Sequence, residues 1–160
     1  MDERHKGRLT RDGIRIHGKA DFAGMRTAGA LAAKILEDVA EQVYVGQTTG
    51  AINDYIEEQV NSAGATSATI GYKGYQHASC ISVNHVVCHG IPSDKKLKDG
   101  DILNIDVTVI VDGWFGDTSR MYVAGKLSRK SERLIQVTHD ALMIGIAAVK
   151  PGNTYVDIGH

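Results

Sequence analysis

The chain has 160 residues, a length that suggests one domain able to bury roughly two thirds of its unfolded surface. Its 18 basic and 19 acidic residues are interspersed and give a net charge of -1, which offers no electrostatic case for binding nucleic acid or an anionic membrane. No apolar run approaches the length of a membrane span, and the basic start lacks the apolar core of a secretory signal. We therefore expect a cytoplasmic protein.

Two helices are predicted first. Apolar residues recur at helical spacing from Asp21 to Val43, which predicts one long helix. Thr48 or Thr49 is suited to cap a second helix, which we expect to end near residues 61–64.

Short strands follow the helices. We predict them near 66–70, 79–83 and 86–88, with a loop rich in glycine and tyrosine between the first two. The only two cysteines, Cys80 and Cys88, are too few for a disulfide framework or a structural zinc site, so we expect reduced thiols.

A hairpin comes next. Residues 102–111 and 114–123 are predicted to pair around Asp112-Gly113, a dipeptide suited to a tight turn. The first strand has one apolar face, which we expect to lie in the core, and one mixed face. The apolar face is Leu103, Ile105, Val107, Val109 and Val111, and the mixed face is Ile102, Asn104, Asp106, Thr108 and Ile110.

Two carboxylates fall on the mixed face of this hairpin. With a two- or four-residue loop, Asp106 lies opposite Ser119 and Thr108 opposite Asp117, so the two aspartates are diagonal neighbours. At about 5 Å and an effective dielectric near 20, they repel by roughly 3 kcal/mol. A divalent metal, a shared proton, or solvation of an ordinary structural face would relieve the repulsion. Arg120 has the opposite parity and is a poor partner.

Two histidines lie just before the hairpin. His85 and His89 are four residues apart, and in the predicted strand this even interval leaves both on one side. Either could be an ordinary surface residue. His89 is the better site candidate, because Gly90 and Pro92 indicate that a strand ends there.

A third helix is predicted from Ser128 to Val149, halted by Pro151. The segment after it resembles the segment after the first helix. A shift of 106 residues superposes Gly46 on Gly152, Thr48 on Thr154 and Ile52 on Ile158. The pattern indicates a repeated module, although a glycine and a threonine cap are also common at helix ends.

Three stretches carry a family resemblance. In chain order they are "MRTAGALAAKIL", "SVNHVVCHGIP" and "LKDGDILNIDVTVIVDGWFGDTSRMYVAG". From about Ile14 onward the chain resembles type I methionine aminopeptidase. The resemblance implies an α+β pita-bread fold, of which residues 1–160 form an incomplete single domain. This is the N-terminal half, an antiparallel sheet with helices on one face, and the second half begins near residue 131.

The resemblance also implies an activity and a set of site residues. The activity is removal of the initiator methionine from nascent peptides, with two divalent ions of cobalt, manganese, iron or zinc activating the water. Asp106 and Asp117 are the implied metal ligands, with Asp117 bridging, and His89 is the implied catalytic residue that contacts the substrate. Tyr72, Tyr75 and Cys80 fall where the family binds the methionine side chain, and the backbone near Asn84 and Val86 falls where a monovalent cation can bind.

The chain departs from the family pattern in three respects. His85 stands where many members have glutamate, and Phe115 where many have a polar residue. The further histidine and two glutamates of the family's metal site do not occur before the last residue. We therefore expect a fragment that is inactive alone, binds divalent metal weakly and self-associates through its exposed face. The alternatives are a non-catalytic half-domain that binds a peptide or partner, and an aspartic protease built around Asp117-Thr118-Ser119.

Overall fold

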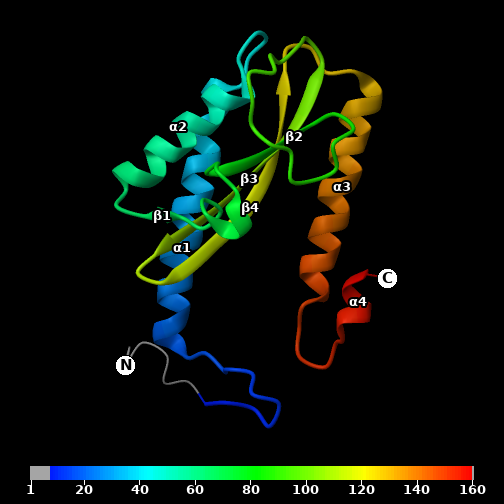
Figure 1. The fold of residues 1–160 in the computed structure, drawn as a ribbon. Helices are drawn as coiled ribbons and strands as arrows, with labels where there is room; N and C mark the ends of the chain where they lie inside the picture. Colours follow the sequence, from blue (N-terminus) through cyan, green and yellow to red (C-terminus); the bar gives the residue numbers. More distant parts are fainter. Residues whose placement is uncertain (1–7, 160) are drawn as a thin grey trace.

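The computed structural model describes residues 8–159 (Figure 1). It has the predicted α+β composition. The elements in chain order are α1 (Lys19–Asp38), the 3-10 helix η2 (Val39–Gln42), α2 (Thr49–Ser62), β1 (Thr66–Ser67), the 3-10 helix η3 (Tyr72–Gly74), β2 (Ser79–Val83), β3 (Asp101–Val111), β4 (Trp114–Ala124), α3 (Arg129–Ala148) and α4 (Tyr155–Gly159).

The sheet is antiparallel and is built around β3. This strand pairs with β4 along its whole length, and with β1 and β2 on its other side. Helices α1 and α2 pack against the sheet, whereas α3 stands apart from them (Figure 1). None of the helices within residues 8–159 is both long enough and apolar enough to cross a membrane.

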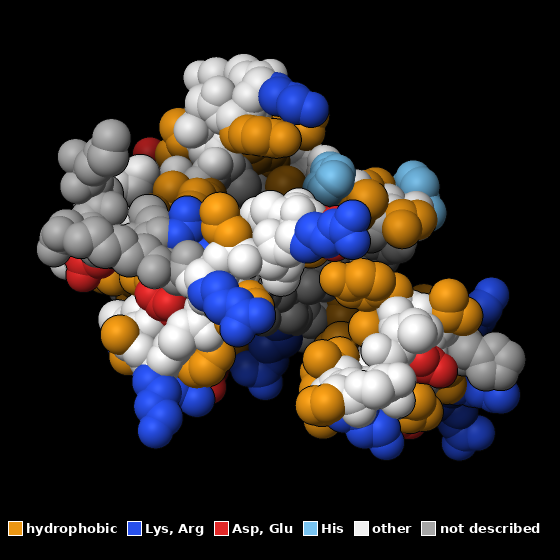
Figure 2. Space-filling view, turned by 90° about the horizontal axis from the view of Figure 1, so that it is seen from below, with side chains coloured by type: hydrophobic (Ala, Val, Ile, Leu, Met, Phe, Trp, Pro, Cys, Tyr) orange, Lys and Arg blue, Asp and Glu red, His pale blue; other side chains and the backbone are white. Residues whose placement is uncertain are grey.

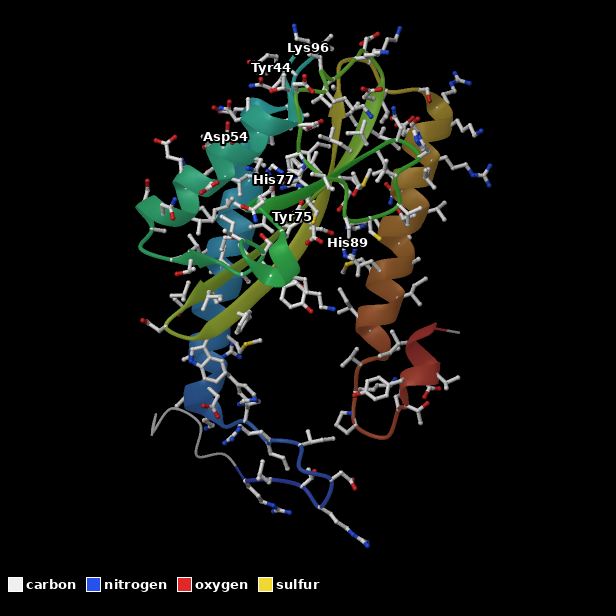
Figure 3. The ribbon with its side chains drawn as sticks, in the orientation of Figure 1. Tyr44, Asp54, Tyr75, His77, His89 and Lys96 are labelled. Atoms are coloured by element: carbon white, nitrogen blue, oxygen red, sulfur yellow. The ribbon has the colours of Figure 1, made fainter. Side chains whose placement is uncertain are left out.

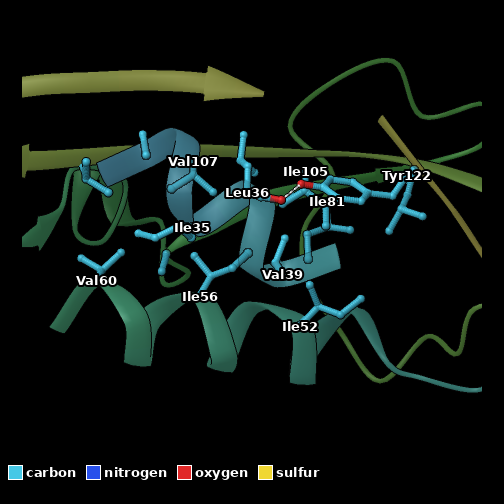
Figure 4. Close-up of a cluster of buried hydrophobic side chains, with 14 of the residues drawn as sticks. Ile35, Leu36, Val39, Ile52, Ile56, Val60, Ile81, Ile105, Val107 and Tyr122 are labelled. Atoms are coloured by element: carbon cyan, nitrogen blue, oxygen red, sulfur yellow. Dashed lines mark hydrogen bonds between the residues drawn. The ribbon is translucent and has the colours of Figure 1, made fainter. Parts of the chain in front are cut away.

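The core fills the space between the sheet and the first two helices (Figure 4). The apolar face predicted for β3 lies inside it, and Leu103, Ile105, Val107 and Val109 are fully buried there. From the helices, Ile35, Ile52 and Ile56 are at most 2% exposed. Burying each such side chain stabilises the fold by about 1.5–3 kcal/mol, so this cluster holds the hairpin rigidly in place.

Tyr122 ties β4 to α1 through the same core. Its hydroxyl donates a hydrogen bond to the carbonyl of Leu36, and its burial raises its pKa to about 12. The ring is only 8% exposed, so the strand and the helix are held in a fixed relationship.

The helix predictions are largely confirmed. The first helix ends at Asp38 and continues as the 3-10 helix η2, a tighter turn of the kind often found at the ends of α-helices. Thr48 is the N-cap of α2, and its hydroxyl accepts a hydrogen bond from the Ala51 amide. Ser128 caps α3 in the same manner, by accepting from the Ser131 amide at 3.2 Å.

The strand predicted at 86–88 is wrong. Residues after Val83 form a loop, because Asn84 and His89 both adopt the left-handed conformation with φ of +55°. At the end of the loop, the Gly90 carbonyl accepts from the Ile81 amide at 2.8 Å, so the loop folds back along β2. The strand predicted at 66–70 is also shorter, since only Thr66–Ser67 pairs with β3.

The two glycine turns in the proposed repeat have the same conformation. Gly46 has φ of +93° and Gly152 has φ of +94°, and each precedes a helix by the same interval. The helix before each turn differs in its surroundings, however. Helix α1 is packed on the sheet, but none of the α3 residues is buried among residues 8–159.

Helix α3 carries apolar side chains that are exposed to solvent. Leu134, Val137 and Leu142 are each more than half exposed, and Tyr155 of α4 is 92% exposed. Figure 2, seen from below, shows hydrophobic side chains over the separate lobe that α3 and α4 form. An amphipathic helix normally buries its apolar side, whereas among residues 8–159 the apolar side of α3 is exposed.

Candidate functional site

The two aspartates occupy one face of the β3–β4 hairpin, in the predicted register. Asp106 pairs with Ser119, and Thr108 pairs with Asp117. The Thr108 hydroxyl donates a hydrogen bond to Oδ1 of Asp117 at 2.9 Å. The hairpin therefore presents two carboxylates on the side of the sheet that the core does not use.

The electrostatics of this face favour a cation. Burial raises the pKa of Asp106, the negative charge of Asp117 raises it further, and His89 lowers it. A positive charge between the two carboxylates would offset the effect of Asp117 on Asp106. This chemistry fits part of a site for a divalent metal ion.

Gly116 explains how Asp117 is held at this position. Gly116 is buried against α1, and a Cβ atom there would lie 2.2 Å from the carbonyl oxygen of Ala28. Only glycine permits so close an approach of the strand to the helix. Because side chains alternate along β4, packing Gly116 onto α1 directs Asp117 to the opposite, open face.

Cys80 lies beside the carboxylates. It pairs with Asp106 across β2 and β3, so the two side chains share a face. Burial raises the pKa of its thiol, and the negative charge of Asp106 raises it further. Both cysteines are free, with Cys80 buried and Cys88 exposed, in agreement with the expected thiols.

The loop before β2 carries two candidate site residues, Tyr72 and Tyr75, and the structure holds them to different degrees. Tyr75 is half-buried, and its hydroxyl donates to the Ser79 carbonyl at 2.9 Å. The centre of its ring lies 5.5 Å from the centre of the His77 ring (Figure 3). Burial and the neighbouring Cys80 thiol raise the Tyr75 pKa. Tyr72 is 66% exposed and its ring lies 5.5 Å from the Lys73 ammonium, so Tyr75 is the more firmly placed of the two.

His89 reaches the site from the loop after β2 (Figure 3). Its imidazole is close enough to Asp106 to influence that carboxyl group. The next residue fixes the loop, because the Gly90 amide donates to Ser82 Oγ at 3.0 Å. His89 is therefore an exposed side chain on an anchored backbone.

His85 and His89 have different surroundings, contrary to the expectation from their spacing. His85 lines a cleft of about 670 Å³ with Ile102 and with Lys130 and Leu134 of α3. The even spacing placed both histidines on one side only if they belonged to a strand, and the chain forms a loop there. His85 is thus not part of the group around Asp106.

Asn84 closes the turn where a monovalent cation was expected. Its side chain donates to Asp101 Oδ1 at 2.8 Å and accepts from the Ile102 amide at 3.1 Å, which fixes the left-handed backbone. Val86 continues this turn, and its amide donates to the Val83 carbonyl at 3.2 Å. The backbone around Asn84 and Val86 is therefore well defined.

The site is partial within residues 8–159. No group of three or more histidine, cysteine, aspartate or glutamate side chains is arranged there to hold a metal. Sequence reasoning missed two contacts. One is the Thr108 hydrogen bond to Asp117, although the register implied it. The other is made by Asn53 of α2, whose side-chain oxygen accepts from the amides of Ala78 and Ser79, and no spacing in the sequence indicates it.

Comparisons with known proteins found similar sequences over most of this chain. The family described as metallopeptidase family M24 matches residues 23–160. Methionine aminopeptidase from Rickettsia prowazekii (strain Madrid E) is 53% identical over 147 residues, which are 92% of this chain and 57% of that protein. Methionine aminopeptidase from Escherichia coli (strain K12) is 50% identical over 151 residues, or 91% of this chain and 56% of that protein. The chain thus spans somewhat more than half the length of these relatives.

Solved structures agree with the fold. The crystal structure of methionine aminopeptidase from Rickettsia prowazekii matches with a TM-score of 0.90 at 53% identity, covering 91% of this chain and 59% of that one. The enzyme from Thermotoga maritima matches with a TM-score of 0.83 at 33% identity, covering 87% and 56%. The antiparallel sheet and its helices correspond to part of the pita-bread structure.

Proposed function

Because the chain belongs to metallopeptidase family M24, we propose that it supplies the first half of a methionine aminopeptidase. The substrate class is nascent peptides that begin with methionine, which also implies a cytoplasmic location. The observation that supports this function most directly is the shared face of Asp106 and Asp117, with Cys80 and His89 beside it.

Asp106 and Asp117 are the proposed metal ligands, and Asp117 would be shared by the two divalent ions. Thr108 supports this role by holding one oxygen of Asp117 at 2.9 Å, which leaves the other oxygen available. When bound, the ions would supply Lewis acidity and an activated water. Carboxylates accept cobalt, manganese, iron and zinc, so the identity of the metal stays open.

The remaining site residues bind and orient the peptide. His89 is the proposed catalytic residue, since its imidazole can donate a hydrogen bond to the oxygen of the scissile amide as charge develops there. Tyr72, Tyr75 and Cys80 form the proposed pocket for the methionine side chain. The backbone near Asn84 and Val86 is the proposed site for a monovalent cation.

We further propose that residues from about 131 onward begin the second half of the fold. The matching glycine turns at Gly46 and Gly152 and the open apolar side of α3 support this proposal. The outer edge of β4 pairs with no strand among residues 8–159. Without a second half, we expect copies of the chain to associate through these two surfaces.

A non-catalytic half-domain that binds a peptide or partner is the second candidate. It is favoured by one observation: within the described residues, no group of three or more histidine, cysteine, aspartate or glutamate side chains is arranged to hold a metal ion. The match to a metallopeptidase family disfavours the aspartic protease alternative.

The test is an assay of the purified chain on a methionyl peptide, with added cobalt or manganese. We expect no turnover by the chain alone. We expect turnover after mixing with the C-terminal portion of the Rickettsia prowazekii relative that the aligned region leaves uncovered. Asp106→Asn should abolish the restored activity, and the exposed Asp54→Asn should not. Robust turnover by the wild-type chain alone that Asp106→Asn abolishes would show that the site is completed without a second half.

A further inference from the structure

Asn53 of α2 is a polar residue inside the core. It is 2% exposed, and its Oδ1 atom accepts three hydrogen bonds from Ala78, just before β2, and Ser79, its first residue. The donors are the Ala78 amide at 3.0 Å, the Ser79 amide at 3.1 Å and the Ser79 hydroxyl at 3.0 Å. Backbone amides can only donate, so the atom that meets them must be the side-chain carbonyl oxygen.

Ser79, whose amide and hydroxyl donate to Asn53, connects two residues of the proposed substrate pocket. The carbonyl of Ser79 accepts the hydrogen bond from the Tyr75 hydroxyl at 2.9 Å. The residue after Ser79 is Cys80, which lies across from Asp106. The Oδ1 atom of Asn53 therefore helps to hold the backbone that bonds to the Tyr75 hydroxyl and leads into Cys80.

The two ends of β2 are held by different groups. At its far end, the Asn84 amide donates to the Ile102 carbonyl at 2.9 Å, and in its middle the Ile81 amide donates to the Gly90 carbonyl at 2.8 Å. At its near end, the Ala78 amide, just before the strand, donates to Asn53. The Ser67 and Thr69 hydroxyls also donate there, to the carbonyls of Ala78 at 3.4 Å and His77 at 2.7 Å. Losing Asn53 should therefore loosen the near end alone.

We infer that Asn53 is a positioning residue that sets the place of Cys80 and Tyr75 relative to the carboxylate pair. The identity of that pocket rests on the proposed function, but the anchor itself rests on the three hydrogen bonds. Because β3 and β4 hold Asp106 and Asp117 independently of α2, the effect on the pocket is separable from any effect on the metal ligands.

The test compares three variants of the 160-residue chain. Asn53→Leu removes the acceptor at similar volume, Asn53→Asp retains an acceptor oxygen, and Val60→Ala weakens the packing of the same helix without touching the anchor. The readout is the rate of alkylation of Cys80 by iodoacetamide, measured by mass spectrometry relative to the exposed Cys88 in the same molecule. Amide hydrogen exchange at Ala78 and Ser79 reports the anchor directly.

We expect Asn53→Leu to raise the ratio of Cys80 to Cys88 alkylation by about tenfold and to speed exchange at both amides. Asn53→Asp should restore a ratio close to that of the wild type. Val60→Ala should lower the melting temperature and leave the ratio unchanged.

An unchanged ratio in folded Asn53→Leu would overturn the inference, as would an equal rise in Val60→Ala. If Asn53→Leu does not fold, Ser79→Ala removes one of the three bonds and should raise the ratio about threefold. No rise in that variant would also overturn the inference. A failure of the proposed peptidase function would appear instead as a lack of metal binding or of complementation, and would leave the alkylation ratios as stated.

Discussion

Thr108 lies directly opposite Asp117 in the β3–β4 hairpin, and its hydroxyl donates a 2.9 Å hydrogen bond to that carboxylate. Asp117 shares this face with Asp106, and its negative charge raises the pKa of the Asp106 carboxyl group. We propose that this hydrogen bond orients the Asp117 carboxylate for a cation shared with Asp106.

Replacing Thr108 with valine keeps the side-chain shape and removes the hydroxyl. We expect Asp117 to become less ordered and divalent metal binding to weaken by about threefold to tenfold, as the loss of one hydrogen bond of about 1 kcal/mol implies. Thr108→Ser retains the donor and should bind like the wild type. Metal titration by calorimetry of both variants checks this, and equal affinities would exclude a role for the hydroxyl.

Gly116→Ala should damage both the fold and the site. The added Cβ would meet the Ala28 carbonyl at 2.2 Å, so β4 must move away from α1 at a cost of about 1–3 kcal/mol. Gly29→Ala is the matched control, because a Cβ atom there meets nothing within 4 Å and alanine favours the helix. Chemical denaturation should show a loss for the first variant and a small gain for the second. A neutral Gly116→Ala would contradict the close packing.

The stability of the metal-free chain should depend on pH through Asp106. Burial and Asp117 raise its pKa in the folded state above the unfolded value, so ionised Asp106 opposes folding. This cost is fully present above the folded pKa and disappears as the pH falls below the unfolded value of about 3.9.

Asp106→Asn should therefore raise the melting temperature by roughly 1–3 °C at pH 7, a gain kept small by solvent screening at a half-buried site. Near pH 3 the gain should vanish. Asp54→Asn, on the exposed side of α2, should show no such pH-dependent difference. Thermal scans across pH 3–7 without metal measure this, and a loss of stability in Asp106→Asn at pH 7 would refute it.

The hairpin is the part of the site that the sequence predicts best. Asp112-Gly113 fixes the turn, the turn fixes the register, and the register places Asp106 and Asp117 on one face. Each step depends on residues that lie close together in the sequence.

The loop after Val83 is harder to predict for the opposite reason. Val86 and Val87 favour a strand by propensity, but the left-handed Asn84 and the bonds that hold Gly90 to β2 override that preference. Asn53 escapes prediction altogether, since a polar residue on a helix ordinarily faces water. Its partners are 25 and 26 residues further along the chain.

The central claim is that Asp106 and Asp117 form part of a divalent metal site. Its most direct test is titration of the purified chain with Mn²⁺, following the free ion by electron paramagnetic resonance. We predict weak binding, on the order of 1 mM, because two carboxylates complete only part of a coordination shell. Asp106→Asn should abolish that binding and Asp54→Asn should retain it. Binding of equal strength in Asp106→Asn and the wild type would contradict the claim.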